Sequence, residues 1–240
     1  MRSRFAVPAA LFLLGMSVLP LALRATHAAS RPERVKTWTW TFQADTLGQE
    51  PQHTSLSTGR WEVALIESPS GTQAAGDFAA DSTKPESTAV PRVLRQAETD
   101  DGIEFHYLQF RKPVIEDLSA SVRFRVLSGE IDPTAGLLFQ LDPKGKNGYL
   151  LRVSGEKNRL VAHYLLQGRR RDLEHVEVPP LEPGTWHTLS VTRKGSVMTA
   201  SYDGVERFRL RDERFRRGTV GLWTEDDTVV EFADLTVSTN

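Results

Sequence analysis

Apolar and polar residues alternate with a period of two along much of the chain, which is the pattern of half-buried β-strands. The alternation is clearest in the last third of the chain, where Leu189 and Val191 share one face of a strand whose other face carries serine and threonine. Asp203-Gly204 separates two such runs and suits a type I′ hairpin turn, in which both central residues need positive φ. Residues 186–237 are therefore predicted to form an antiparallel β meander.

Similar runs occupy the middle of the chain, and turn residues separate them at intervals of about 8–12 residues. Sustained helical periodicity is absent after the first 29 residues. The sequence therefore predicts an all-β protein that forms an antiparallel sandwich or a barrel. The other expected strands are 37–42, 60–66, 93–96, 104–110, 118–126, 137–141, 149–153 and 160–164.

The start of the chain has the composition of a signal peptide. Arg2 and Arg4 precede an apolar stretch at residues 5–23, and small residues follow it. We expect cleavage after Ala28 or Ala29 and export to the periplasm or the extracellular space. An uncleaved membrane anchor is the alternative, but two prolines and a glycine interrupt the apolar stretch.

Residues 30–240 are expected to form a single domain, with turn-rich segments at 47–59 and 67–91. We interpret the second segment as a long exposed loop. The mature chain has no second apolar stretch of spanning length, so no membrane association is expected after cleavage. Loss of the signal peptide would change the formal net charge from −1 to about −4, a balance unlike that of nucleic-acid-binding proteins. The chain has no cysteine, which excludes disulfides and thiolate metal sites.

Polar residues that face away from the core suggest a candidate ligand site. If the strands at 118–126, 137–141, 149–153 and 160–164 are neighbours, these residues lie on one side of one sheet. Their side chains hydrogen-bond to hydroxyl or carboxylate groups, although a solvated sheet face without a ligand is the alternative. The candidates are Arg123, Arg125, Gln140, Arg152 and His163. Arg169-Arg-Arg171 is interpreted as the solvated face of a hairpin, and a docking patch for an anionic partner is the alternative.

Trp223 also faces away from the predicted core. Val220 and Leu222 take the core face of its strand, which leaves Trp223 on the opposite face beside Gly221. An indole over small residues can stack on a sugar ring, and packing beneath the long loop is the alternative. The other tryptophans, Trp38, Trp40, Trp61 and Trp186, are expected in the core.

Short motifs spread over the chain resemble those of one group of proteins. They are Ser121-Val-Arg-Phe-Arg125, Ser128-Gly129-Glu-Ile-Asp132, Ala135-Gly-Leu137, Asn147-Gly-Tyr149, Gly184-Thr-Trp-His-Thr-Leu189, Tyr202-Asp-Gly204, Gly218-Thr-Val-Gly-Leu-Trp-Thr224 and Phe232-Ala-Asp-Leu235. The set resembles bacterial exported proteins of the concanavalin A-like lectin/glucanase superfamily. The most similar named domain is the 3-keto-disaccharide hydrolase family, and the resemblance covers nearly all of the mature chain.

This resemblance implies a jelly roll with a concave face that binds a saccharide or glycan. The first hypothesis is an exported, non-catalytic carbohydrate-binding protein; the second is a 3-keto-glycoside hydrolase or lyase, and the third is a structural envelope module. Similar jelly rolls often hold a structural calcium ion, for which Asp45 and Asp234 are the available carboxylates. No other cofactor is expected, and the sequence does not indicate an oligomeric state.

Hydrolase motifs are incomplete in the chain. Glu130-Ile-Asp132 begins the Glu-x-Asp-x-x-Glu motif of glycoside hydrolase family 16, but Ala135 stands in the position of its last carboxylate. A retaining glycosidase needs two carboxyl groups about 5 Å apart, so this mechanism is disfavoured. The sequence also lacks the Gly-x-Ser-x-Gly and His-Glu-x-x-His motifs. Whether the protein is an enzyme is therefore left open.

Overall fold

The computed structural model describes residues 34–66, 90–99 and 105–240. The predicted signal peptide, 1–29, and nearly all of the predicted loop, 67–91, lie outside the described residues. Every described strand belongs to one compact unit, Val35–Asn240. Among the described residues, no helix is both long enough and apolar enough to cross a membrane.

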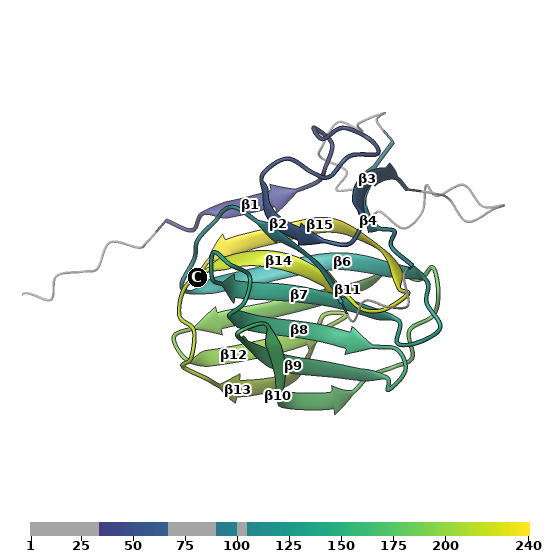
Figure 1. The fold of residues 1–240 in the computed structure, drawn as a ribbon. Coiled ribbons are helices and arrows are strands. Elements are labelled where there is room, and N and C mark those ends of the chain that lie inside the picture. Colours follow the sequence, from purple (N-terminus) through teal and green to yellow (C-terminus); the bar gives the residue numbers. More distant parts are fainter. Residues whose placement is uncertain (1–33, 67–89, 100–104) are drawn as a thin grey trace, which may run out of the picture. The chain divides into compact units, whose positions relative to one another are not determined.

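Fifteen strands of the described residues form two antiparallel sheets (Figure 1), which we call sheet A and sheet B. Sheet A has the spatial order β13 (Val205–Arg211), β12 (Val197–Tyr202), β11 (His187–Lys194), β6 (Leu118–Ser128), β15 (Val229–Thr239), β4 (Arg92–Gln96) and β3 (Trp61–Leu65), and β1 (Thr37–Trp40) also pairs with β15. Sheet B has the order β10 (Arg169–Glu177), β9 (Arg159–Leu166), β8 (Gly148–Ser154), β7 (Thr134–Leu141), β14 (Thr219–Thr224), β5 (His106–Phe110) and β2 (Thr54–Thr58).

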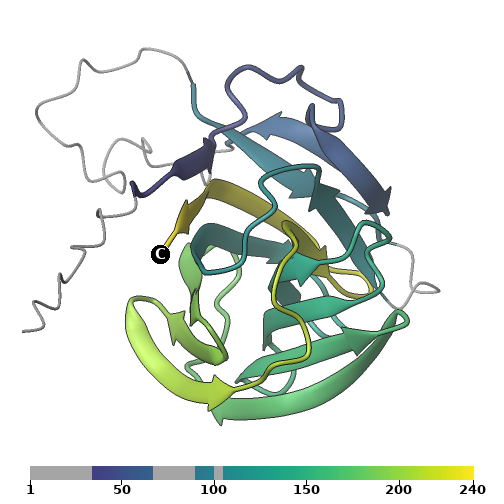
Figure 2. The ribbon, with the colours of Figure 1, turned by 90° about the vertical axis from the view of Figure 1, so that its left-hand side faces the viewer.

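The two sheets lie face to face (Figure 2) and share one hydrophobic core. Val122, Leu189 and Phe232 of sheet A and Leu151 and Leu222 of sheet B are at most 1 % exposed within it. These are the faces that the alternation of apolar and polar residues predicts. The all-β, two-sheet antiparallel sandwich is therefore confirmed.

The last third of the chain is a meander only in part. β11, β12 and β13 are sequential neighbours, and the turn between β12 and β13 has positive φ at both Asp203 (50°) and Gly204 (74°), as predicted. However, β14 crosses to sheet B, where it lies between β7 and β5, and β15 returns to sheet A beside β6. The predicted continuous meander is wrong at β14, because alternation fixes the face of a strand but not its neighbours.

The strands β2 and β10 were not expected from the sequence. β2 falls in the predicted turn-rich segment 47–59, and β10 contains the arginine run that was interpreted as a solvated hairpin face. Both are the outermost strands of sheet B, and most residues of β10 are exposed. An edge strand with few buried side chains has little apolar alternation, so the hydrophobic pattern could not reveal it.

Candidate functional site

The face of sheet B that is turned away from sheet A carries a second apolar cluster. Its residues alternate along their strands with residues of the main core, and β7, β8 and β14 are consequently buried along their whole length. We call this group the outer cluster. It consists of Leu138, Leu141, Leu150, Leu165 and Trp223, with Phe105 and Tyr107 packed against it.

Trp223 occupies the outer cluster because two glycines leave room for its strand and its ring. A Cβ atom on Gly136 would lie 3.0 Å from Cβ of Trp223, and one on Gly221 would lie 2.5 Å from the carbonyl oxygen of Leu108. The predicted orientation of Trp223 is confirmed. The indole is only 3 % exposed, however, because Phe105 stacks on it with 4.5 Å between ring centroids and 18° between planes. The aromatic ring that reaches solvent is therefore that of the partly exposed Phe105.

Next to the outer cluster, Arg152 lies in a buried network of charged groups. Its Nη1 donates to Asp132 Oδ2 at 3.1 Å, and its Nε lies 3.4 Å from Glu225 Oε1. Asp132 also accepts hydrogen bonds from Ser154 Oγ and the backbone N–H of Glu156. Arg152 is 8 % exposed, so its charge is balanced by protein carboxylates and not by solvent.

Glu225 is the residue in this network that faces a pocket. Its Oε1 accepts a hydrogen bond from Trp223 Nε1 at 2.9 Å and pairs with both Arg152 and Arg170. Among the described residues no donor contacts its second oxygen, Oε2, and this atom is not one of the buried atoms that lack a partner. The carboxylate is therefore held by Oε1, and because Glu225 is only 4 % exposed, only a small part of it lines the pocket.

His163 lies behind Arg152. Arg152 Nε donates to His163 Nε2 at 3.2 Å, and Asp172 Oδ1 lies 2.9 Å from His163 Nδ1. Because an arginine can only donate, Nε2 accepts, and the ring proton belongs on Nδ1. Burial, together with the charges of Arg152 and Arg170, lowers the pKa of His163 from 6.5 to about 3, although Asp172 acts in the opposite direction. His163 is thus a neutral acceptor that orients Arg152.

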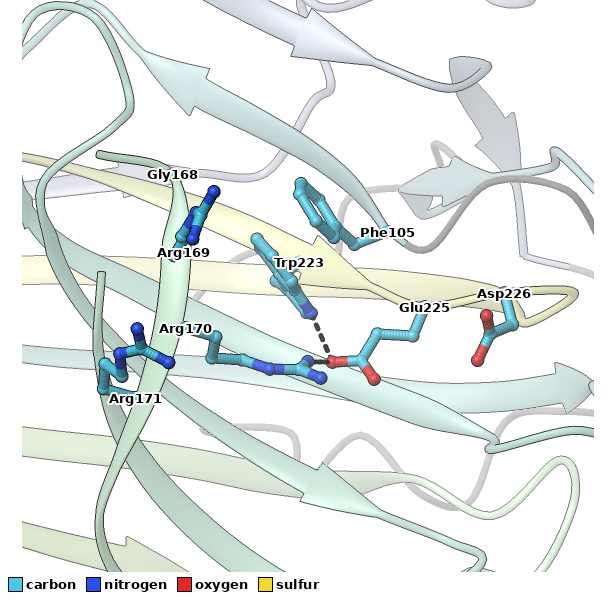
Figure 3. A pocket seen from close by; sticks show the side chains of 8 residues that line it. All are labelled: Phe105, Gly168, Arg169, Arg170, Arg171, Trp223, Glu225 and Asp226. Atoms are coloured by element: carbon cyan, nitrogen blue, oxygen red, sulfur yellow. Dashed lines mark hydrogen bonds and ion pairs between the residues drawn. The ribbon is translucent and has the colours of Figure 1, made fainter. Parts of the chain in front are cut away.

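Two adjoining pockets open beside this network and share Phe105, Gly168 and Trp223. The first has a volume of about 450 Å³ and contains the charged groups, and the second, of about 180 Å³, is mostly apolar. Figure 3 shows the Trp223 indole and the Arg170 guanidinium both directed to Glu225, with Phe105 beside the indole. The larger pocket is lined by Phe105, Gly168, Arg169, Arg170, Arg171, Trp223, Glu225 and Asp226. Its size lies within the range of about 300–1,000 Å³ that is usual for small-molecule sites.

Asp226 is the second carboxylate of the larger pocket. Burial, with the negative charges of Asp132 and Asp227, raises the pKa of Asp226, and Arg170 and Arg152 oppose this effect. Glu225 is paired with two arginines, so the two neighbouring carboxyl groups have different electrostatic environments. The pocket therefore offers an anchored carboxylate, Glu225, and a second carboxylate, Asp226, whose pKa is raised.

The five predicted polar candidates do not form one patch. Arg152 and His163 lie together on the outer face of sheet B, near Trp223. Arg123 and Arg125 are on β6, which belongs to sheet A, so their predicted place beside Arg152 is wrong. Gln140 has a positive φ of 51°, is 1 % exposed and donates to the carbonyl oxygens of Glu116 and Arg216. It therefore fixes loops of the sandwich and does not face the pocket.

The predicted calcium ligands have protein partners of their own. Asp45 Oδ1 accepts the backbone N–H of Gln52 at 2.8 Å, and Asp234 Oδ2 pairs with Arg123 at 3.1 Å. In residues 34–66, 90–99 and 105–240, no group of three or more histidine, aspartate or glutamate side chains has the arrangement of a metal site. The predicted calcium site is therefore not confirmed by the described residues.

Phe105, Arg170, Glu225 and Asp226 were not identified from the sequence. Phe105 precedes β5, and Glu225 and Asp226 directly follow β14, so all three lie at the ends of neighbouring strands. The pairing of β5 with β14 brings them together, and no pattern in the sequence indicates that pairing. Arg170 pairs in register with Leu165 of the outer cluster, and detection of β10 would have placed it on this face.

Comparisons with known proteins show a shared fold. No protein-family model matches the chain, and no curated protein sequence is significantly similar to it. The carbohydrate-binding module CBM66 from Bacillus subtilis aligns with a TM-score of 0.54 and 17% identity, over 59% of this chain and 84% of that module. This likeness supports the concanavalin A-like sandwich.

Two further solved structures have lower scores. A protein of unknown function with a galectin-like fold, from Bacillus subtilis, has a TM-score of 0.49 at 11% identity, over 60% of this chain and 81% of that one. The exoplasmic/lumenal domain of VIP36, in its Ca2+/Man-bound form, has a TM-score of 0.48 at 12% identity, over 62% and 78% of the two chains.

Proposed function

We propose that the protein binds a saccharide in the larger pocket on the outer face of sheet B. The observation that carries this proposal is the carboxylate of Glu225. Trp223 and Arg170 donate to its Oε1 and Arg152 lies beside the same atom, whereas no donor among the described residues contacts Oε2, which lies near the partly exposed ring of Phe105. Sugar hydroxyls donate to carboxylates, and the apolar face of a sugar ring packs on an aromatic ring. Both kinds of contact are available within one pocket.

The charges in the pocket favour a ligand with hydroxyl groups. Arg170 can donate with the N–H groups that Glu225 does not use, and 35 % of its side chain is exposed. Glu225 and Asp226 both accept. A ligand that both donates and accepts, such as a polyol or a sugar, matches this set. CBM66 is by its name a carbohydrate-binding module, which agrees with the proposal although that likeness shows the fold alone.

The test is binding to short cello-, malto-, xylo-, manno-, laminari-, galacto- and fructo-oligosaccharides by titration calorimetry. For the tightest ligand, Glu225→Gln should weaken binding by roughly 1.5–3 kcal/mol, the range for hydrogen bonds to a charged group. Glu213→Gln, at an exposed carboxylate, is the matched control and should bind normally. Wild-type protein that binds none of these sugars would contradict the proposal.

Glu225→Gln removes a charge that balances Arg152 and Arg170, so a second variant is needed in case the first does not fold. Phe105→Ala leaves the charged network intact and removes a partly exposed ring. It should weaken binding to the same sugar while the far-UV spectrum remains that of the wild type. Unchanged affinity in Phe105→Ala would place the sugar outside this pocket.

Hydrolysis or elimination of a 3-keto-glycoside is a second candidate, which the raised pKa of Asp226 beside the anchored Glu225 favours. The matching assay is release of 4-nitrophenol from a 4-nitrophenyl 3-keto-glucoside. Turnover that is lost in Asp226→Asn would establish catalysis. Since no family model matches the chain, the narrower resemblance to the 3-keto-disaccharide hydrolases remains part of this second candidate only.

A further inference from the structure

A tryptophan on sheet A has an arrangement unlike that of a core residue. Trp186 immediately precedes β11, which pairs with β6, and the register places His187 opposite Phe124. The ring of Trp186 lies over two guanidinium groups, with Cζ of Arg123 4.9 Å and Cζ of Arg125 5.1 Å from its centroid. Trp186 is therefore on the outer face of sheet A, and its predicted place in the core is wrong.

The two arginines beneath this ring differ in their surroundings. Arg125 is 4 % exposed, and its Nε donates to the fully buried carboxylate of Glu231 at 2.7 Å. Arg95 pairs with the same carboxylate at 2.7 Å. Arg123 instead pairs with Asp234 near solvent, where 24% and 48% of the two side chains are exposed. Arg125 thus supports the indole from below, and the Arg123–Asp234 pair borders it at the surface.

A pocket of about 420 Å³ borders the same indole. It is lined by Trp186, Arg123, Gly184 and Thr185, and Arg125 is not part of its lining. A Cβ atom added to Gly184 would meet no atom within 4 Å, so the backbone leaves the approach to the indole open.

We propose that this pocket is a second saccharide site, on the opposite sheet from the first. The indole provides a flat aromatic surface that the guanidinium groups of Arg123 and Arg125 hold in place. Arg123 and Asp234 provide a donor and an acceptor at its edge, and Thr185 adds a hydroxyl group. A sugar ring that packs on the indole and hydrogen-bonds at its edge matches these groups.

The two sites face away from each other, because each lies on the outer face of its sheet. One molecule would therefore bind two glycan chains, or two parts of one chain that bends around it. The second site shares its ligand class with the proposed function but shares no residue with the first pocket. The two proposals can consequently fail separately.

The test is an NMR titration with the oligosaccharide panel named above, observed at the indole Nε1–H signals. Variants Trp186→Phe and Trp223→Phe assign the two signals. Saturable shifts of both signals are expected with the binding sugar, because Trp223 Nε1 contacts Glu225 in the first pocket and Trp186 borders the second. A shift of the Trp223 signal alone would overturn the second site and leave the first intact. A shift of the Trp186 signal alone would support the second site and contradict the first.

Two variants test whether a shift of the Trp186 signal reports contact between the sugar and the second pocket. Trp186→Ala should weaken binding at the second site about tenfold or more, the factor that corresponds to 1.4 kcal/mol, without affecting the Trp223 signal. Asp234→Asn keeps a residue type that tolerates the positive φ of 52° at this position and should also weaken the second site. Retention of the Trp186 shift in Asp234→Asn, or no shift of either signal with any sugar of the panel, would overturn the proposal.

Discussion

Arg152 is the residue on which the charge balance of the first pocket depends. The sequence suggested that it contacts a ligand directly. In the structure it is buried between Asp132 and Glu225 and receives its orientation from His163. Its carboxylate partners lie on other parts of the chain, so the spacing of residues around Arg152 could not indicate its burial.

Replacement of this arginine should therefore affect folding. Arg152→Ala leaves the buried carboxylate of Asp132 without its arginine partner and removes one of the two arginines beside Glu225, and we expect the free energy of unfolding to fall by about 3–5 kcal/mol. Urea denaturation measures this change. The control is Arg209→Ala, which breaks an exposed pair with Glu206 and should cost less than about 1 kcal/mol. Equal stability of Arg152→Ala and wild type would contradict the buried network.

His163 makes the stability of the protein depend on pH. Its pKa is lowered to about 3 in the folded state, whereas the unfolded chain has the ordinary value of 6.5. Between these two values the unfolded state binds a proton that the folded state does not. The contribution of His163 is therefore fully present above pH 6.5 and is lost as the pH falls towards 3, at up to about 1.4 kcal/mol per pH unit.

Denaturation of wild type and His163→Gln between pH 7 and 4 checks this prediction. Most of that interval lies between the folded and unfolded pKa values of His163. Glutamine can still accept from Arg152 but cannot titrate. The difference in stability between the two proteins should change with pH in favour of the variant under acid conditions. Parallel curves would show that His163 has an ordinary pKa in the folded protein.

Strand β11 provides a test of the assignment of faces. Leu189 is fully buried in the main core, and Thr192, on the opposite face of the same strand, is exposed. Leu189→Asp should lower the free energy of unfolding by about 4 kcal/mol or more, because it buries an unpaired charge. Thr192→Asp should change it by less than about 0.5 kcal/mol. Similar thermal stability of the two variants would mean that the faces of β11 are reversed.

The sequence predicted the strands better than their partners. Alternation is a local property, so it gave the inward faces of β6, β8 and β11 correctly. It did not place β14 between β7 and β5. Both faces of β14 are buried in sheet B, and the alternation of residues within one strand does not identify the sheet to which the strand belongs. The same contrast between faces and partners holds for the candidate site. Arg152, His163 and Trp223 were placed on the correct faces, and Arg123 and Arg125 were assigned to the wrong sheet.

At the scale of the whole chain, the signal peptide remains a prediction. Residues 1–29 combine an arginine-containing start, an apolar stretch and small residues, so the mature protein should begin near Ala29 or Ser30. Mass spectrometry of the protein recovered from the periplasm or the culture medium measures this end. A chain that begins at Met1 in those fractions would contradict cleavage.

The central claim is that a sugar binds between Glu225 and Phe105 on the outer face of sheet B. A crystal structure of the protein with the tightest oligosaccharide of the panel tests this claim most directly. We expect a sugar hydroxyl within hydrogen-bond distance of Glu225 Oε2 and a sugar ring packed against Phe105. A sugar that is bound only elsewhere on the protein, with neither residue in contact, would contradict the claim.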